Sequence, residues 1–252
     1  MAKAIVQVKD LKKVYDDKVA VDGISFEVEK GEIFGILGPN GAGKTTTLEM
    51  METLREIDGG EAIIDGINVA HDPTGIKRII GVQPQTAAFQ DKQKLAEIIE
   101  MFAAAYGERV DPKEFLEDVQ LGEKASAYAE QLSGGQRQRL SIATALVHSP
   151  TVFFLDEPTT GLDPQARRNL WDLIREVRDR GVTVILTTHY MDEAELLCDR
   201  VAIMDKGKII TIDKPKNLIK QLLGRGFKKH QEVQQANLED VFIDLTGKGL
   251  RE

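Results

Sequence analysis

The sequence lacks the features of a secreted or membrane-spanning chain. Cys198 is its only cysteine, so no intramolecular disulfide is possible and a reducing compartment suits it. We expect this cysteine to be a buried small hydrophobe. The longest unbroken apolar stretch runs from Met101 to Tyr106, far short of the roughly 20 residues of a spanning helix. The N-terminal segment is too charged for a signal peptide. We therefore predict a cytoplasmic protein that needs another chain for any membrane-embedded part.

Basic residues are outnumbered by acidic ones. The chain has 33 lysines and arginines against 41 aspartates and glutamates, which gives a formal net charge of −8 at pH 7. Nucleic acids are bound mainly through positive charge, so this balance argues against nucleic acid as the main partner, although a local basic patch can exist within an acidic total. With 252 residues, the chain suits one large or two intimate domains with ample core.

Hydrophobic patterning predicts strands on both sides of a helical middle. Strands are predicted within 4–37 and at 61–69, 78–82, 151–155 and 182–188, with a last hairpin at 200–204 and 208–212. The near-continuous apolar runs among them are typical of strands buried on both faces of a parallel sheet. Between 86 and 149 helix formers replace β-branched alternation, which indicates an inserted helical lobe. Helices are also predicted from Gly43 to about Leu54 and after Asp163, an N-cap followed by Pro164.

A glycine-rich run between a buried strand and a helix is typical of a phosphate-binding P-loop. Its glycines allow backbone N–H groups to face phosphates, and the helix adds its positive end. Lys44 would bring a mobile charge to the outer phosphates, and Thr45 a hydroxyl to Mg²⁺. An ordinary glycine-rich turn is the alternative, which the flanking elements disfavour. The residues predicted to contact the nucleotide here are Gly38, Pro39, Asn40, Gly41, Ala42, Gly43, Lys44, Thr45 and Thr46.

Two further strands end in residues that suit nucleotide chemistry. Asp156 and Glu157 follow the strand 151–155, and His189 follows the strand 182–188. Ligands gather at the carboxyl ends of parallel strands, so we expect these side chains beside the P-loop. Asp156 would hold Mg²⁺, Glu157 would polarise the attacking water as a base, and His189 would contact the γ-phosphate or that water. Solvated carboxylates and a structural histidine are the alternatives, and the P-loop makes them the weaker ones.

The run from Leu132 to Gln136 offers a second anion site. Ser133 is a good N-cap, and two glycines leave the N–H groups of the next helix unobstructed. A capped surface helix would explain the serine but not the double glycine with Gln136. A simple P-loop kinase or GTPase has no use for this second site.

Taken together, these motifs resemble the ATP-binding subunits of ABC transporters over nearly the whole chain. The resemblance implies an α/β fold, a P-loop NTPase of the ABC ATPase type, in which a mostly parallel core sheet carries an antiparallel β subdomain and an inserted helical lobe. It implies one ABC ATPase domain over 1–252. The core and β subdomain would occupy about 1–85 and 150–212, the lobe about 86–149, and a short extension about 213–252.

The resemblance also assigns roles to individual residues. Ser133, Gly134, Gly135 and Gln136 would close over the γ-phosphate of an ATP held by a second subunit, so that two chains enclose two ATP molecules head to tail. Tyr15 would stack on adenine. Gln85, rather than its neighbour Gln83, would reach Mg²⁺ together with Thr45 and Asp156. Asp163 would carry signals across the dimer. Lys44, Glu157 and His189 would form the catalytic set.

ATP and Mg²⁺ are the ligands that the resemblance implies. The partners would be a separate membrane permease, reached through Gln85 and the segment from Thr86 to about Tyr106, and a second ATP-binding subunit that would form a homodimer. The protein would work at the cytoplasmic face of the cell membrane. The ending 237–251 resembles that of bacterial drug-exporter-type members, which suggests export, although the stretch 213–236 is shorter than usual.

Two alternatives remain open within the same family. One is a soluble ABC-type ATPase that acts on DNA, ribosomes or a protein complex. It is disfavoured because the chain has no long coiled coil, no second cassette and no basic linker. The other is a membrane-attached ATPase that signals rather than transports, and it would use the same cassette.

Overall fold

The computed structural model describes residues 4–85, 88–90 and 92–227. The chain divides into two units, Met1–Asn217 and Leu218–Glu252, and the functional residues considered below belong to the first. The exporter-like ending 237–251 lies outside the described residues. None of the described helices combines the length and the apolar character required to span a bilayer.

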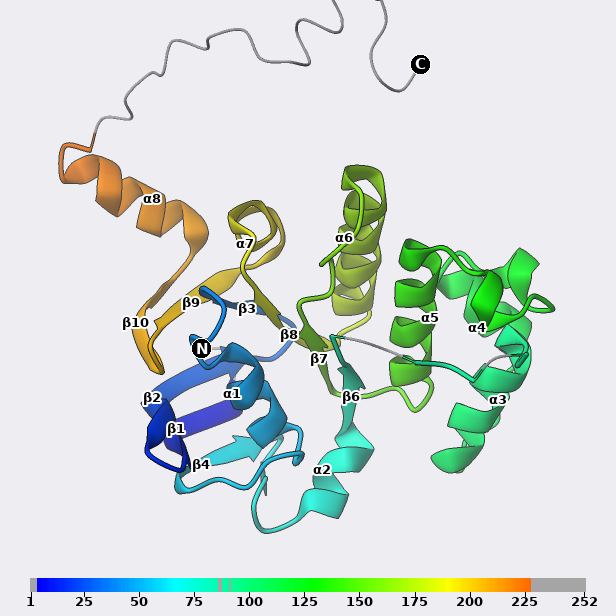
Figure 1. Cartoon of the computed structure of the whole chain (residues 1–252), viewed down its shortest axis with the longest axis horizontal. Coiled ribbons are helices and arrows are strands. Elements are labelled where there is room, and N and C mark those ends of the chain that lie inside the picture. Colours follow the sequence, from blue (N-terminus) through cyan, green and yellow to red (C-terminus); the bar gives the residue numbers. More distant parts are fainter. Residues whose placement is uncertain (1–3, 86–87, 91, 228–252) are drawn as a thin grey trace, which may run out of the picture. The chain divides into compact units, whose positions relative to one another are not determined.

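A six-stranded sheet forms the centre of the first unit (Figure 1). Its strands, in the order β10-β9-β3-β8-β7-β6, are β10 (Lys208–Asp213), β9 (Arg200–Asp205), β3 (Ile33–Leu37), β8 (Thr183–Thr188), β7 (Val152–Asp156) and β6 (Ile80–Gln83). All neighbours run parallel except β10, which pairs antiparallel with β9. Every residue of β3, β7 and β8 is buried, which accounts for their apolar sequences. The predicted mostly parallel core sheet is confirmed.

A smaller antiparallel sheet packs against the central one. Its strands, in the order β2-β1-β4-β5, are β2 (Lys18–Glu29), β1 (Ala4–Tyr15), β4 (Gly59–Ile64) and β5 (Ile67–Asn68). Buried and exposed residues alternate along β2, because one face of this sheet is turned to the core. Phe26 of β2 stacks on Phe34 of β3, with ring centroids 5.3 Å apart, and so joins the two sheets. The predicted antiparallel β subdomain is therefore also confirmed.

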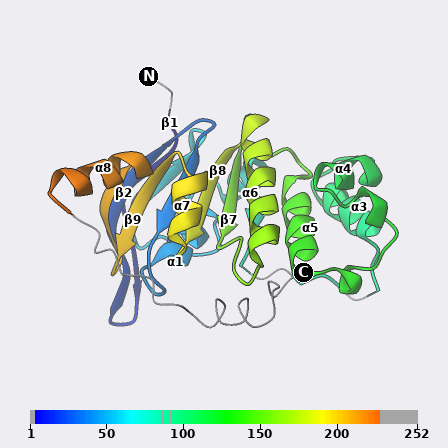
Figure 2. The ribbon, with the colours of Figure 1, turned by 90° about the horizontal axis from the view of Figure 1, so that it is seen from above.

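Helices follow most of the strands and occupy the stretch of chain between β6 and β7. That interval contains α3 (Leu95–Ala105), α4 (Pro112–Asp118), α5 (Gly134–Leu146) and two 3₁₀ turns, Gly122–Lys124 and Ala129–Gln131. The helices that follow the other strands are α1 (Lys44–Met51), α2 (Pro73–Ile79), α6 (Pro164–Asp179), α7 (Met191–Leu197) and α8 (Pro215–Gly224). Figure 2 shows α5 and α6 side by side, in agreement with the close approach of Gly135 and Ala166.

Between the predicted strands, two short helices, α2 and α7, were not predicted from the sequence. The strand expected at 78–82 begins only at Ile80, because α2 occupies the preceding residues. The start signal was present: Asp72 accepts a hydrogen bond from the Gly75 N–H at 2.8 Å, and Pro73 follows it. The other is α7, which has no side-chain cap hydrogen bond and only seven residues.

Cys198 is buried, as predicted. It is 7 % exposed, and burial raises the pKa of its thiol well above the ordinary value. A Cβ on Gly35 of β3 would lie only 2.6 Å from the Sγ of Cys198. The cysteine side chain therefore occupies the space beside this glycine. The residue therefore acts as a small apolar packing group.

Glu52 is a buried carboxyl at the carboxyl end of α1. It is 6 % exposed, and burial, reinforced by the charges of Asp156 and Glu49, raises its pKa to about 8. The folded protein therefore holds this proton at neutral pH, whereas the unfolded chain releases it near the ordinary carboxyl pKa of 4.5.

We expect Glu52→Gln to stabilise the fold progressively, relative to the wild type, as the pH rises from about 5 to about 8. Because the folded protein holds the proton more tightly, rising pH favours unfolding of the wild type by up to about 1.4 kcal/mol per pH unit in this window. Glutamine has no proton to lose. Denaturant unfolding of both proteins in EDTA, without nucleotide, measures the difference, and a pH-independent difference would contradict the expectation.

Candidate functional site

Three neighbouring strands bring the predicted site residues to one edge of the central sheet. Gly38 follows β3, Glu157 follows β7, and His189 follows β8. The strands β3, β8 and β7 are adjacent and parallel, and the pairs Leu37–Thr188 and Asp156–Thr187 are in register at their carboxyl ends. Ligand sites of open α/β sheets lie at this edge, as the sequence predicts.

A cavity of about 490 Å³ opens at this edge. The described residues that line it are Asn40, Gly41, Gly43, Lys44, Thr45, Thr46, Gln85, Glu157, Thr160 and His189. Nine of these ten were predicted from the sequence, and they come from the P-loop, the segment after β6 and the segments after β7 and β8. The structure therefore brings together residues that are far apart in the chain.

Lys44 is held inside the P-loop. Its side chain is 4 % exposed, and its Nζ donates to the carbonyl oxygens of Gly38 at 2.8 Å and Pro39 at 3.2 Å. The same Nζ lies 3.3 Å from Oε1 of Glu157. A buried ammonium with a single carboxylate partner attracts further anions strongly, because the interior screens charge poorly.

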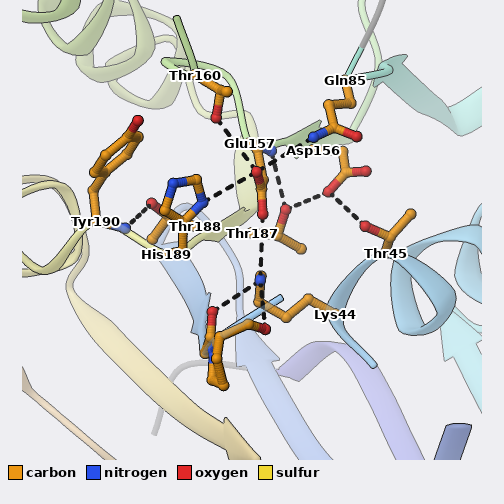
Figure 3. A network of polar contacts seen from close by, with 12 residues as sticks. Lys44, Thr45, Gln85, Asp156, Glu157, Thr160, Thr187, Thr188, His189 and Tyr190 are labelled. Carbon is orange, nitrogen blue, oxygen red and sulfur yellow. Dashed lines mark hydrogen bonds and ion pairs between the residues drawn. The ribbon is translucent and has the colours of Figure 1, made fainter. Parts of the chain in front are cut away.

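Donor groups from four segments converge on Glu157 (Figure 3). Its Oε2 accepts from Gln85 Nε2 at 3.3 Å and from Thr160 Oγ1 at 3.3 Å, and lies 3.1 Å from His189 Nδ1. The other carboxylate oxygen of Glu157, Oε1, forms an ion pair with Nζ of Lys44. Burial by itself would raise the pKa of Glu157, but the hydrogen bond from His189 and the charge of Lys44 outweigh it, so the pKa lies below its ordinary value.

The backbone of Glu157 is strained as well as buried. Its φ of 47° lies in the left-handed region, which a side chain with a Cβ seldom adopts. Its N–H donates to Thr187 Oγ1 at 3.0 Å, and this bond helps to hold the unusual turn. The turn directs the carboxylate into the cavity, whereas the neighbouring Asp156 is turned toward Thr45.

The residues near Thr45 fit a magnesium ion. Thr45 Oγ1 lies 3.2 Å from Asp156 Oδ1, which also accepts from Thr187 Oγ1, so hydroxyl and carboxylate oxygens are already adjacent. The described residues contain no cluster of three or more His, Cys, Asp or Glu side chains able to hold a metal. Magnesium is commonly held by only one or two carboxylates, with water and substrate phosphates completing its octahedron, so this sparse set suits it.

Two P-loop glycines are required by close backbone approach. A Cβ on Gly38 would collide with the carbonyl oxygen of Met204, and Gly43 combines a φ of 103° with the Ala20 carbonyl 2.5 Å from where a Cβ would be. Gly43 is also the N-cap of α1 and has no side chain to occupy the helix start. The helix N–H groups are therefore left open to an anion. Ala42, by contrast, is buried and does not line the cavity.

The second predicted anion site lies at the start of α5. Ser133 caps this helix, accepting from Gln136 N–H at 3.3 Å, while Gln136 Oε1 accepts from Ser133 N–H at 3.1 Å, which is a capping box. Gln136 Oε1 also accepts from Lys124 Nζ at 3.3 Å. Ser133 and Gly134 are exposed, Gly135 and Gln136 are half-buried, and none of these residues lines the described cavity. The structure thus does not bring this run to the chain's own P-loop.

The remaining predicted residues lie at separate places. Tyr15 is half-buried at the end of β1, where Lys13 and Arg55 place cations 5.5 Å and 5.8 Å from its ring centroid. It does not line the described cavity. Asp163 caps α6 and accepts from Gln165 and Ala166 N–H at 2.9 Å, as its predicted N-cap role requires. Gln85 faces Glu157, whereas Gln83 is fully buried at the end of β6.

Sequence reasoning missed Thr160 and Thr187. Thr160 contacts Glu157, and Thr187 joins the backbone of Glu157 to the carboxylate of Asp156. Thr187 was visible as the first of two threonines that end β8 after three apolar residues, and it lies directly opposite Asp156 in the register. No comparable pattern marks Thr160, which lies in an irregular loop.

Comparisons with known proteins identify the family of the chain. The family model for ABC transporters matches residues 21–160. The chain is 42 % identical to a Nod factor export ATP-binding protein I of Burkholderia thailandensis, over 89 % of this chain and 75 % of that protein. It is 37 % identical to the linearmycin resistance ATP-binding protein LnrL of Bacillus subtilis, over 98 % of this chain and 76 % of that protein.

Solved structures show the same fold. An ATP-binding subunit of an ABC transporter matches with a TM-score of 0.78 and 28 % identity, over 96 % of this chain and 99 % of that one. The cbiO1 protein of Clostridium perfringens, described as part of the ABC transporter complex cbiONQ, matches with a TM-score of 0.77 and 28 % identity, over 88 % and 94 % of the two chains. From its site, its sequence relatives and its fold, the chain belongs to the ABC transporter family and is an ATP-binding subunit that hydrolyses ATP.

Proposed function

We propose that this chain is the energy-supplying subunit of an exporter, in which two copies enclose ATP and drive a separate membrane permease. The observation that carries the proposal is the separation of two anion sites on one chain. The cavity at the P-loop contains the groups needed for hydrolysis, while the open helix start at Ser133 lies outside it.

Lys44, Thr45, Asp156 and Gln85 bind the triphosphate and its magnesium ion in this proposal. Lys44 and the N–H groups at the start of α1 bind the phosphates, and the hydroxyl of Thr45, the carboxylate of Asp156 and the amide of Gln85 hold Mg²⁺. The ion, when bound, neutralises charge that develops on the phosphates. Tyr15 stacks on adenine, and the other P-loop residues from Gly38 to Thr46 surround the phosphates.

Glu157 is the general base, and His189 orients the reacting groups. A phosphate that binds Lys44 competes with Glu157 for the ammonium, and Lys44 is one of the two groups that depress the pKa of Glu157. Loss of that partner raises the pKa of Glu157 from its depressed value, and a carboxylate with a higher pKa is a stronger base. Substrate binding would thereby strengthen the base that acts on it.

The second anion site serves the other copy of the chain. Two free N–H groups, a serine hydroxyl and glycines without side chains can approach a γ-phosphate closely, and two copies related by a two-fold axis would each present this surface to the other's P-loop. Asp163, at the start of the helix that packs beside α5, would transmit the position of one site to the other. A homodimer is the simplest assembly that satisfies both sites.

The permease and the direction of transport follow from the relatives. The names of the relatives describe Nod factor export and linearmycin resistance, which suggests export by this chain as well. The described helices offer no membrane span, so a separate permease would supply the path, and the chain would lie at the cytoplasmic face of the membrane. Nucleic acid is not expected as a partner, because the chain is acidic.

We expect Glu157→Gln to bind ATP normally and to lower turnover by roughly 10²–10⁴-fold, because the amide cannot accept a proton from water. The variant should also accumulate as a closed dimer in ATP and Mg²⁺. Steady-state phosphate release and light scattering after gel filtration measure the two effects. Glu195→Gln, the same change at an exposed position of α7, is the control and should keep wild-type turnover. Normal hydrolysis by Glu157→Gln would remove Glu157 from the role of base.

We expect Ser133→Arg to abolish ATP-driven dimerisation while leaving ATP binding to the monomer intact. The bulky cation would fill the helix start that receives the partner's phosphate, yet it lies outside the cavity that binds this chain's own nucleotide. The change is made in the Glu157→Gln background, and nucleotide affinity and mass in solution are measured together. Ser126→Arg, at an exposed position of the same lobe, is the matched control. Dimers of the Ser133 variant would contradict the shared site.

A further inference from the structure

Glu193 is a buried carboxyl that the mechanism above does not use. It lies on α7 with no exposed surface, and its Oε1 accepts a hydrogen bond from the indole Nε1–H of Trp171 on α6 at 2.9 Å. Trp171 is itself 6 % exposed. Carboxylates are almost never fully buried unless they are paired, so the position of Glu193 requires an explanation.

The hydroxyls around Glu193 come from the segments that carry the hydrolytic side chains. Burial raises the pKa of Glu193, and the nearby side chains of Thr188, Trp171 and Thr159 oppose this. Within the described residues, Oε2 of Glu193 and the hydroxyl of Thr159 make no hydrogen bond. Thr188 immediately precedes His189, and Thr159 is separated from Glu157 by a single residue. The side chain of Glu193 therefore lies between the loop after β7 and the end of β8. Those two segments are the ones that place Glu157 and His189 3.1 Å apart.

A second set of contacts joins the same helices one turn away. Arg167 precedes Trp171 by four residues on α6, and its Nη1 lies 3.3 Å from Asp192 Oδ2 on α7. Its guanidinium also lies 4.3 Å from the ring centroid of Tyr190, the residue after His189. Successive turns of α6 thus contact α7 and the residue beside His189.

The other end of this connection is the second anion site. The first turn of α6 packs on the start of α5, where a Cβ on Gly135 would lie 3.2 Å from the Cβ of Ala166. A Cβ on Gly134 would lie 4.0 Å from Cδ2 of Leu162, just before α6. A continuous set of packed side chains therefore runs from the helix start at Ser133, through α6, to Glu193 and the two hydrolytic residues.

We propose that Glu193 is a positioning residue that holds Glu157 and His189 in their mutual geometry and ties that geometry to α6, on which the second anion site packs. The inference rests on the proposed roles of Glu157 and His189. Through it, docking of a partner's phosphate at Ser133 would influence hydrolysis at this chain's own P-loop. Small displacements suffice for this, because a misplacement of about 1 Å at a reacting group can cost about 10²-fold in rate.

The experiment compares Glu193→Leu with Glu193→Gln in the full chain. Leucine fills the space without an acceptor for the indole, and we expect kcat to fall about tenfold or more while the affinity for ATP, measured by equilibrium binding, changes by less than about twofold. Glutamine retains an acceptor oxygen and should restore kcat to within about threefold of the wild type. Glu195→Gln is the control for a change on the same helix. Thermal unfolding accompanies each measurement.

Trp171→Phe tests the same contact from the other side. It keeps an aromatic ring in the core but removes the N–H, so we expect the same selective loss of kcat. Combined with Glu193→Leu, it should cost little more than either change alone, because both remove one interaction. If Glu193→Leu does not fold, Trp171→Phe alone still tests the contact between Glu193 and the indole.

An unchanged kcat in the folded leucine variant would overturn the proposal, and so would a parallel loss of kcat and ATP affinity that glutamine does not restore. If the leucine variant does not fold, an unchanged kcat in Trp171→Phe overturns it instead. Glu157→Gln is assayed in parallel. Normal turnover in that variant would refute the proposed site itself, whereas its loss beside an unaffected Glu193→Leu would refute only the positioning role.

Discussion

The structure of the site depends on one buried carboxylate. A charge removed from water must be compensated by hydrogen bonds and opposite charge, and Glu157 obtains these from Lys44, Gln85, Thr160 and His189. These partners come from the P-loop, the end of β6, the loop after β7 and the end of β8. A single electrostatic requirement thereby holds four segments of the chain at one edge of the sheet. Because any group that binds Lys44 or Gln85 alters this balance, the site is sensitive to what occupies it.

The strands and the residues at their ends were predictable because burial leaves a strong mark on sequence. Apolar runs revealed β3, β7 and β8, and the rule for parallel sheets then placed Gly38, Glu157 and His189 together. Asp163 with Pro164 marked the start of α6. The same start signal at Asp72 and Pro73 did not lead to a helix prediction, because the apolar residues after it favoured a strand. For α7, two turns with no capping side chain left too little periodicity to detect.

The contacts between the site residues were less predictable than the identity of those residues. Nothing in the sequence indicates that Thr187 would join the backbone N–H of Glu157 to the carboxylate of Asp156, or that Glu193 on α7 would be buried against Trp171 on α6. Glu193 stands among charged residues, in a stretch that resembles a solvated helix face. Tertiary packing alone decides which carboxylate turns inward, so Glu193 is buried while Asp192 and Glu195 are exposed.

The chain has a single tryptophan, and it lies at the contact between α6 and α7. Intrinsic emission excited at the red edge of the protein band therefore originates from this one buried ring. Indole emission responds to hydrogen bonding at its nitrogen, and Glu193 accepts that hydrogen bond. The protein thus carries a native optical probe at the junction between its two anion sites, and no label need be introduced to follow that junction in real time.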